Sequence, residues 1–353
     1  MKLDEQNGHM TAAVLYGRED LKVEEVAIPA LADDEVLVRV KVALTCGTDL
    51  KVWRRGYHAR MITPPALFGH ELAGVVAAVG LAARGGVRVG MRVVPANSAP
   101  CNACLFCRKD RQNLCEDLLF NNGAYAEFVR IPGRIVQQNL LEIPDHVSYR
   151  DAAMVEPLAC VLRGIEETHV RTGDTAVVVG CGPIGLKFVR VLSARGVRVI
   201  ALGKRRCQVE NAERVGAAAA FDVTHLDNPV EMVRKFTEGQ RGADAVIEAV
   251  GSPLTWEWAI GMVRRGGTVN LFGGCPQGAE VHVDPTALHY SEITIRSTFH
   301  HTPRHIREAL DTIARGEVRA GDFVGGEIQL EDLPREFEHM KRRNGELKTA
   351  VIP

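Results

Sequence analysis

The sequence predicts an α/β protein in which a strand-rich barrel is followed by a doubly wound parallel sheet and a helical tail. Over roughly the first 150 residues, apolar side chains recur at every second position in short runs, which is typical of half-buried strands. From about Asp151, apolar runs of strand length alternate with helical stretches, which is typical of βαβ units. The length of 353 residues suits two such domains better than a single core.

The strand-rich part shows its pattern most clearly in residues 36–44, VLVRVKVAL, where apolar side chains line one face. Residues 72–79 and 87–94 are further strand candidates, rich in valine and glycine. We expect a compact β-barrel whose loops hold the motifs described below.

The second part predicts a parallel sheet, because its strand candidates are separated by helices long enough for crossover connections. The candidate strands are residues 176–179, 197–202, 217–221, 245–249, 268–272 and 292–297, and the first two are followed by the helical stretches 186–194 and 209–215. The tail contains two further helical stretches, 303–315 and 333–342, and we expect it to return to the first domain. The predicted domains are therefore 1–158, 159–297 and 298–353.

Composition and charge exclude several classes of protein. The chain is 46% hydrophobic and 25% charged, with a net charge of −1, which gives no reason to expect nucleic acid or an anionic membrane as a partner. No apolar run approaches the roughly 20 residues of a membrane helix. Residues 1–9 are polar, lack the apolar segment of a signal peptide and suggest a loose extension, so we expect a cytoplasmic protein. In such a chain, clustered cysteines indicate metal binding rather than disulfides.

The strongest local motif is a cluster of cysteines with the spacing C-x2-C-x2-C-x7-C. Its members are Cys101, Cys104, Cys107 and Cys115. Soft thiolates in one short loop suit a tetrahedral zinc ion with no open position, although closely spaced cysteines also hold iron–sulfur clusters. We expect a structural zinc that stabilises a lobe of the first domain.

A second zinc site is predicted from Cys46, in Cys-Gly-Thr-Asp, and His70, in Gly-His-Glu. A lone cysteine or histidine is usually structural, but the two together with nearby carboxylates favour a catalytic zinc, which takes three protein ligands and keeps one position open. Glu71 or Glu156 can supply the third ligand, and the sequence leaves both open.

Two further side chains in the Cys46 motif fit roles in catalysis. Asp49 can accept the second ring N–H of His70 and so fix its tautomer. The hydroxyl of Thr48 is close enough in sequence to relay a proton from an alcohol. The nearby residues Trp53 and Tyr57, with the arginines between them, either line the substrate site or form an ordinary loop.

A glycine-rich turn follows the first strand of the second domain. Its proposed cofactor-binding residues are Gly180, Gly182, Pro183, Ile184 and Gly185. Such a turn opens a helix whose N-terminus can hold a pyrophosphate, although an ordinary βα turn remains the alternative. Zinc together with a nicotinamide cofactor indicates alcohol–carbonyl interconversion.

The end of the second strand indicates which nicotinamide cofactor is bound. An acidic residue there would bind the ribose hydroxyls, but the strand ends in Gly203, Lys204, Arg205 and Arg206. The glycine leaves room for a 2′-phosphate and the basic residues supply charge for it, so we favour NADP over NAD. The alternative is a solvated basic turn. Val250 and Phe272, at the ends of two later strands, complete the proposed cofactor-binding set.

Taken together from Met10 onward, these motifs resemble the zinc-dependent medium-chain dehydrogenase/reductase superfamily, nearest its polyol (sorbitol) and threonine dehydrogenase branch. The resemblance implies a GroES-like barrel domain, a Rossmann domain, a cleft between them, and a homodimer or homotetramer. It also implies that Cys46, His70 and Glu71 hold the catalytic zinc, with Glu156 close by. Lys51 stands where the family often has a histidine in the proton path, and Gly203 replaces the usual aspartate.

We therefore expect a zinc-dependent oxidoreductase that transfers a hydride between a secondary alcohol and a nicotinamide cofactor, with two zinc ions per chain. The substrate would be a polyol, a sugar derivative or a hydroxy amino acid. The alternatives are a zinc-independent quinone or enone reductase and a zinc-binding relative without catalysis.

Overall fold

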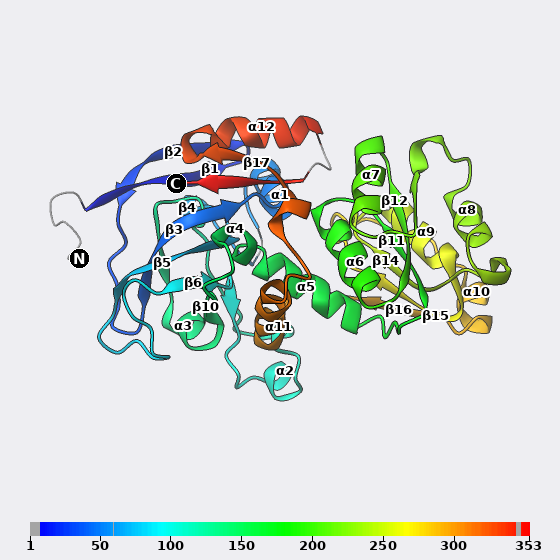
Figure 1. The fold of residues 1–353 in the computed structure, drawn as a ribbon, viewed down its shortest axis with the longest axis horizontal. Coiled ribbons are helices and arrows are strands. Elements are labelled where there is room, and N and C mark those ends of the chain that lie inside the picture. The colour runs from blue at the N-terminus through cyan, green and yellow to red at the C-terminus, as the bar shows by residue number, and fades with distance from the viewer. Residues whose placement is uncertain (1–7, 59, 344–346) are drawn as a thin grey trace. The chain divides into compact units, whose positions relative to one another are not determined.

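The computed structural model describes residues 8–58, 60–343 and 347–353, so most of the predicted N-terminal extension lies outside the described residues. The chain forms two compact units (Figure 1). Unit 1 comprises the chain up to Ala159 together with His301–Pro353, and unit 2 comprises Cys160–His300. Unit 1 is therefore assembled from both ends of the chain.

The main sheet of unit 1 has the strand order β10-β6-β5-β3-β18-β17, and β9 also pairs with β3. Its strands are β3 (Val36–Leu44), β5 (Leu72–Val79), β6 (Arg92–Pro95), β9 (Phe128–Ile131), β10 (Leu140–Glu142), β17 (Val324–Gln329) and β18 (Lys348–Ile352). Strands β3 and β5 match the predicted ranges. The strand predicted at 87–94 is shorter, because Gly90 adopts a φ of 87° in a turn and β6 begins only after it.

Smaller sheets complete unit 1. Strands β1 (His9–Gly17), β2 (Asp20–Ala27) and β4 (Ala66–Leu67) form one, in the order β2-β1-β4. Strands β7 (Ser98–Ala99) and β8 (Leu119–Phe120) pair with each other, and the four-cysteine segment lies between them in the chain. The helices of this unit are α1 (Gly47–Arg55), α2 (Leu105–Arg108), α3 (Gly133–Asn139), α4 (Tyr149–Ala152), α11 (Pro303–Ala314) and α12 (Leu333–Arg343).

The C-terminal tail forms part of unit 1. Strand β18 pairs with β3 in antiparallel fashion and with β17 in parallel fashion. Helix α12 brings the fully buried Phe337 against Trp53, Phe68 and Tyr125, with ring centroids 5.7, 5.7 and 6.2 Å away. These aromatic contacts lie in a hydrophobic core cluster of unit 1, so Trp53 is a core residue and not part of a substrate-facing loop.

Unit 2 is built on a six-stranded parallel sheet with the order β13-β12-β11-β14-β15-β16. Its strands are β11 (Thr175–Val179), β12 (Arg198–Gly203), β13 (Ala219–Asp222), β14 (Ala243–Glu248), β15 (Val263–Leu271) and β16 (Thr294–Ser297). Its helices after α5 are α6 (Pro183–Ala194), α7 (Arg206–Arg214), α8 (Pro229–Lys235), α9 (Pro253–Met262) and α10 (Pro285–Tyr290). The strand order reverses direction between β11 and β14, and ligands of such sheets bind at this switch point.

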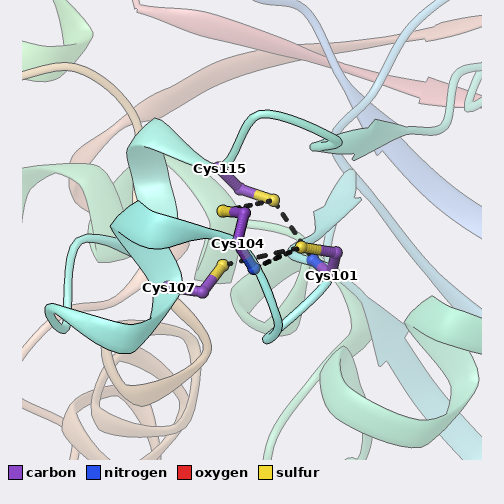
Figure 2. Close-up of side chains that lie close together, drawn as sticks. All are labelled: Cys101, Cys104, Cys107 and Cys115. Carbon is purple, nitrogen blue, oxygen red and sulfur yellow. Dashed lines mark hydrogen bonds between the residues drawn. The ribbon is translucent and has the colours of Figure 1, made fainter.

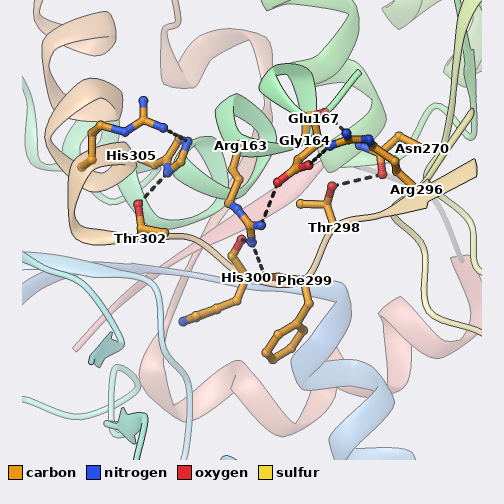
Figure 3. A network of polar contacts seen from close by, with 11 residues as sticks. Arg163, Gly164, Glu167, Asn270, Arg296, Thr298, Phe299, His300, Thr302 and His305 are labelled. Carbon is orange, nitrogen blue, oxygen red and sulfur yellow. Dashed lines mark hydrogen bonds and ion pairs between the residues drawn. The ribbon is translucent and has the colours of Figure 1, made fainter. Parts of the chain in front are cut away.

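Polar contacts attach the end of unit 2 to helix α5 (Val155–Glu166), part of which lies in unit 2 (Figure 3). The buried Arg163 donates to the carbonyl oxygen of Phe299 at 2.8 Å and to Glu167 at 3.0 Å. Glu167 also accepts from Arg296 of β16 at 2.6 Å. A carboxylate shared by two guanidinium groups fixes the last strand of the sheet to this helix.

None of the helices within the described ranges combines the length and the apolar character that a membrane span requires.

Candidate zinc and cofactor sites

The four-cysteine cluster comes together in a loop that contains α2 (Figure 2). Its four sulfur atoms lie within 4.8 Å of one another. The distances are 4.0 Å between the sulfurs of Cys101 and Cys107, and 3.9 Å between those of Cys104 and Cys115. None of these cysteines forms a disulfide.

This arrangement fits one tetrahedral zinc ion. With Zn–S bonds of about 2.3 Å, neighbouring sulfurs in a tetrahedron stand about 3.8 Å apart, close to the distances observed. The backbone N–H groups of Ala103 and Cys104 point at the sulfur of Cys101 and lower the pKa of its thiol. Backbone N–H donors likewise lower the pKa of Cys104 to about 6. A multi-iron cluster would hold the sulfurs farther apart, so the geometry favours the zinc alternative.

Cys46, His70 and Glu71 converge on a second point, which we call the Cys46 site. Their ligand atoms lie within 4.8 Å of one another, and all three residues are buried. The sheet explains this convergence. Strand β3 ends shortly before Cys46, and β5 begins immediately after Glu71. Because β3 and β5 are antiparallel neighbours, these two ends meet at the same edge.

Asp49 holds the ring of His70. The Nδ1 atom of His70 donates to Oδ1 of Asp49 at 2.8 Å, which is the hydrogen bond that the sequence predicts. Asp49 lies in the first turn of α1, just after Cys46, and is only 2% exposed. With Nδ1 engaged, Nε2 is the ring nitrogen available to a metal ion.

Glu71 shows that the Cys46 site suits a cation. Its Oε1 accepts from the ammonium group of Lys348 at 2.7 Å, and the same ammonium donates to Thr45 O at 2.9 Å. Its Oε2 is buried and has no hydrogen-bond partner among the described residues. A buried carboxylate oxygen without a donor is costly unless a cation is bound there. Zinc therefore fits these residues.

Glu156, the other candidate ligand, is buried but is not one of the three converging residues. Burial raises its pKa to about 7. Its Oε1 lies 3.8 Å from Nε2 of His301, and that nitrogen lies 3.0 Å from Oδ1 of Asn97. Of the two glutamates that the sequence left open, the structure thus brings Glu71 to Cys46 and His70.

The electrostatic potential at the Cys46 site is negative. Burial alone would lower the pKa of Lys348, but Glu71 and Cys46 raise it. Burial would likewise lower the pKa of His70, and Asp49 and Cys46 raise it well above its usual value. The negatively charged groups around Lys348 and His70 thus favour positive charge at this site.

The other two proposed catalytic residues lie on α1. Thr48 is half-buried, and Lys51 is exposed. The structure gives no contact between Lys51 and the Cys46 site within the described part of the chain. The partial burial of Thr48 and the exposure of Lys51 therefore support a catalytic role for Thr48 more than for Lys51.

Two residues that the sequence did not single out complete the surroundings of the Cys46 site. Lys348 is far away in sequence and has no local motif, so only the return of the tail reveals it. Tyr125 is fully buried and donates from its hydroxyl to Oδ2 of Asp49 at 2.6 Å. Burial raises the pKa of Tyr125 well above its ordinary value, which keeps the hydroxyl a donor.

In unit 2, the glycine turn has a backbone that requires glycine. Gly180 has a φ of 104°, which an L side chain rarely adopts. A Cβ at Gly185 would lie 1.7 Å from the carbonyl oxygen of Gly180, so the start of α6 packs directly on the turn. Gly182 caps that helix and Pro183 is its first residue. The arrangement suits a pyrophosphate at the helix N-terminus.

The basic turn after β12 agrees only in part with the expected site for a 2′-phosphate. Gly203 is buried at the strand end, while Lys204 and Arg206 are exposed. Arg206 pairs with Glu210 at 2.8 Å, so part of its charge is already compensated. The backbone N–H of Lys204 donates to Gln208 at 3.0 Å, and Gln208 fills the space beside Gly203.

Val250 and Phe272 lie at the ends of β14 and β15. Val250 is 44% exposed, and its Cγ2 would be 2.6 Å from a Cβ at Gly180. Phe272 packs edge-on against Phe188, 5.1 Å away. The buried Glu248 holds this region by accepting from the N–H groups of Val250 and Gly251 at 2.8 and 2.9 Å. The sequence feature that could have identified Glu248 is a carboxylate at the end of an otherwise apolar strand.

A barrel with two candidate zinc sites, joined to a parallel sheet with a glycine turn at its switch point, defines a zinc-binding dehydrogenase. Comparison with known proteins agrees. Residues 32–145 match the family of the alcohol dehydrogenase GroES-like domain, and residues 183–315 match the zinc-binding dehydrogenase family.

The chain also resembles whole proteins along almost all of its length. It is 30% identical to D-xylulose reductase A of Aspergillus oryzae over 96% of this chain and 95% of that protein. It is 29% identical to sorbitol dehydrogenase of Bacillus subtilis over 98% of each.

Among solved structures, a protein of Sinorhizobium meliloti assigned as a zinc-binding dehydrogenase and bound to NADP has a TM-score of 0.88 at 30% identity, covering 98% of this chain and 100% of that one. A 2R,3R-butanediol dehydrogenase of Bacillus subtilis has a TM-score of 0.86 at 27% identity, covering 98% and 99%. The chain belongs to the zinc-dependent medium-chain dehydrogenase/reductase superfamily, nearest its polyol dehydrogenases, which interconvert secondary alcohols and carbonyls with a nicotinamide cofactor.

The two candidate zinc sites should differ in lability. The four-cysteine cluster would supply all four ligands of a zinc ion, whereas the Cys46 site would supply three and leave one position open. We expect metal analysis to find two zinc ions per chain, and a mild chelator to remove one of them together with the activity while the fold remains. A single zinc that survives the chelator with full activity would contradict this assignment.

Proposed function

We propose that this protein oxidises the secondary alcohol of a polyol, a sugar derivative or a hydroxy amino acid, and reduces the corresponding carbonyl, with zinc bound by Cys46, His70 and Glu71 and with NADP as the favoured cofactor. The observation that supports this most is the convergence of these three buried side chains, with Glu71 Oε2 lacking a donor among the described residues. The relatives named for xylulose, sorbitol and butanediol favour a substrate with more than one oxygen function.

Bound zinc would supply a Lewis acid that lowers the pKa of an alcohol hydroxyl. The residues of the chain have separate tasks around it. Asp49 fixes the orientation of His70, and Lys348 balances the charge of Glu71. Thr48, beside Asp49 on α1, would accept the proton of the alcohol and pass it outward, with Lys51 toward the outer end of that path. In unit 2, the glycine turn and Val250 would place the nicotinamide for hydride transfer.

The function is tested with a panel of polyols, sugar phosphates and hydroxy amino acids, each with NAD and with NADP. We expect hydride transfer from at least one secondary alcohol by the protein with its zinc, and none after removal of the labile zinc. Turnover of quinones or enones that is indifferent to zinc removal would instead support a reductase without catalytic zinc.

On the substrate found in this panel, Thr48→Val should lower kcat by about 100-fold or more, because it removes the relay hydroxyl and keeps the side-chain shape. The zinc content should not change, because Thr48 is not a proposed ligand. Lys51→Ala, on the exposed face of the same helix, provides the comparison and should cost less. Undiminished kcat in the Thr48 variant would exclude the relay.

Cofactor preference should follow the end of β12. We expect kcat/KM with NADP to exceed that with NAD by about tenfold or more, because a charge-assisted contact to the 2′-phosphate contributes roughly 1.5–3 kcal/mol. Gly203→Asp should shift the preference toward NAD by adding a carboxylate.

Gly203→Ala is the steric control for that substitution. A Cβ at Gly203 would already lie 3.0 Å from Cβ of Gln208, so part of any effect could come from crowding alone. Equal kcat/KM values for the two cofactors in the unmodified protein would refute the phosphate pocket and leave the dehydrogenase assignment standing.

We also propose that the protein is cytoplasmic and forms a homodimer or homotetramer. Strand β16 is at the edge of its sheet, and its Ile295 is 36% exposed. Unpaired backbone groups and an apolar side chain at a sheet edge favour pairing with a second copy. Sedimentation should show an oligomer that Ile295→Lys weakens. A monomeric unmodified protein would contradict the assembly.

A further inference from the structure

The hydroxyl of Tyr125 ends between two segments that form the Cys46 site. It donates to Oδ2 of Asp49 at 2.6 Å and lies 3.1 Å from the carbonyl oxygen of Leu44, at the end of β3. A hydroxyl has one proton, and the shorter contact to a carboxylate is the stronger one. The other oxygen of Asp49 accepts from His70. Tyr125, Asp49 and His70 therefore form a continuous chain of hydrogen bonds.

The ring and backbone of Tyr125 also hold the segment that precedes His70. Gly69 has a φ of 87°, and a Cβ there would lie 2.6 Å from the ring of Tyr125. The backbone N–H of Tyr125 donates to Phe68 O at 3.0 Å, and the N–H of Gly123 donates to Gly69 O at 2.9 Å. The glycine of Gly-His-Glu is thus required by the close approach of this tyrosine. One residue contacts the segments of both Asp49 and His70.

We propose that Tyr125 is a positioning residue for the catalytic zinc, whose hydroxyl fixes the carboxylate of Asp49 in the orientation that holds the ring of His70. The inference rests on the proposed function, because it requires zinc at the Cys46 site. Asp49 is 2% exposed, so without the tyrosine hydroxyl one of its oxygens loses its donor and the carboxylate becomes free to turn. A ligand held in the wrong orientation releases its metal ion more easily.

Tyr125→Phe tests this with minimal change, because it removes the hydroxyl and keeps the ring against Phe68 and Phe337. The measurement is the rate of zinc transfer from the protein to a chromophoric chelator, with the zinc of the four-cysteine cluster as an internal reference. We expect release from the Cys46 site at least about fivefold faster, below the roughly 10–100-fold effects on metal affinity found for direct partners of ligands.

Tyr16→Phe is the matched control. The hydroxyl of Tyr16 also donates to a carboxylate, that of Glu24, but Tyr16 is 42% exposed and the pair lies on strands β1 and β2. Its substitution should leave both zinc release rates unchanged. The same release rate in the Tyr125 variant as in the unmodified protein, or a slower one, would overturn the inference.

A double-mutant cycle shows whether Tyr125 acts through Asp49. In an Asp49→Ala background, Tyr125→Phe should have no further effect on zinc release, and an undiminished effect would also overturn the inference. Failure of the proposed function gives a different result. In that case, the unmodified protein itself would contain one zinc, held by the four-cysteine cluster.

Discussion

The register of three adjacent strands, β5, β3 and β18, is the constraint on which the Cys46 site depends. Ala43 of β3 pairs with Leu72 of β5, and Leu44 pairs with Ala350 of β18. These pairings place the C-terminal end of β3 next to the N-terminal ends of β5 and β18. Cys46, the His70–Glu71 pair and Lys348 therefore meet, although they come from distant parts of the chain. A slip of one residue in β18 would turn Lys348 to the other face.

This assembly concentrates buried charge, and charge balance explains its composition. A carboxylate as deeply buried as Glu71 needs a partner, and Lys348 provides one for a single oxygen. Removing one member of a buried ion pair typically costs roughly 3–5 kcal/mol. A metal ion would compensate the remaining negative charge. Through its ion pair with Lys348, Glu71 thus also links the C-terminal strand to the barrel.

Unit 2 meets a different requirement, which is close approach of backbone to ligand. Gly180 and Gly185 allow the turn and helix α6 to pack without side chains between them. Glu248 uses its carboxylate to order the loop after β14, and Trp256 donates to Gly273 O at 3.0 Å in the neighbouring loop. The strand ends at the switch point are therefore held by buried hydrogen bonds, while Val250 remains available at the surface.

The sequence by itself determined the features that local chemistry encodes. These are the alternation that forms β3 and β5, the βαβ series, the cysteine spacing and the glycine turn. It also determined the Asp49–His70 contact, because both residues lie in motifs whose chemistry requires it. The family resemblance implied Glu71 as the third ligand, and the tertiary structure brought Glu71, rather than Glu156, to Cys46 and His70. The tertiary structure alone revealed Lys348 and Tyr125. It also showed that Trp53 is in the core and that Arg206 is paired with Glu210. The physical reason is that long-range strand pairing and burial decide which distant side chains meet, and no local pattern records them.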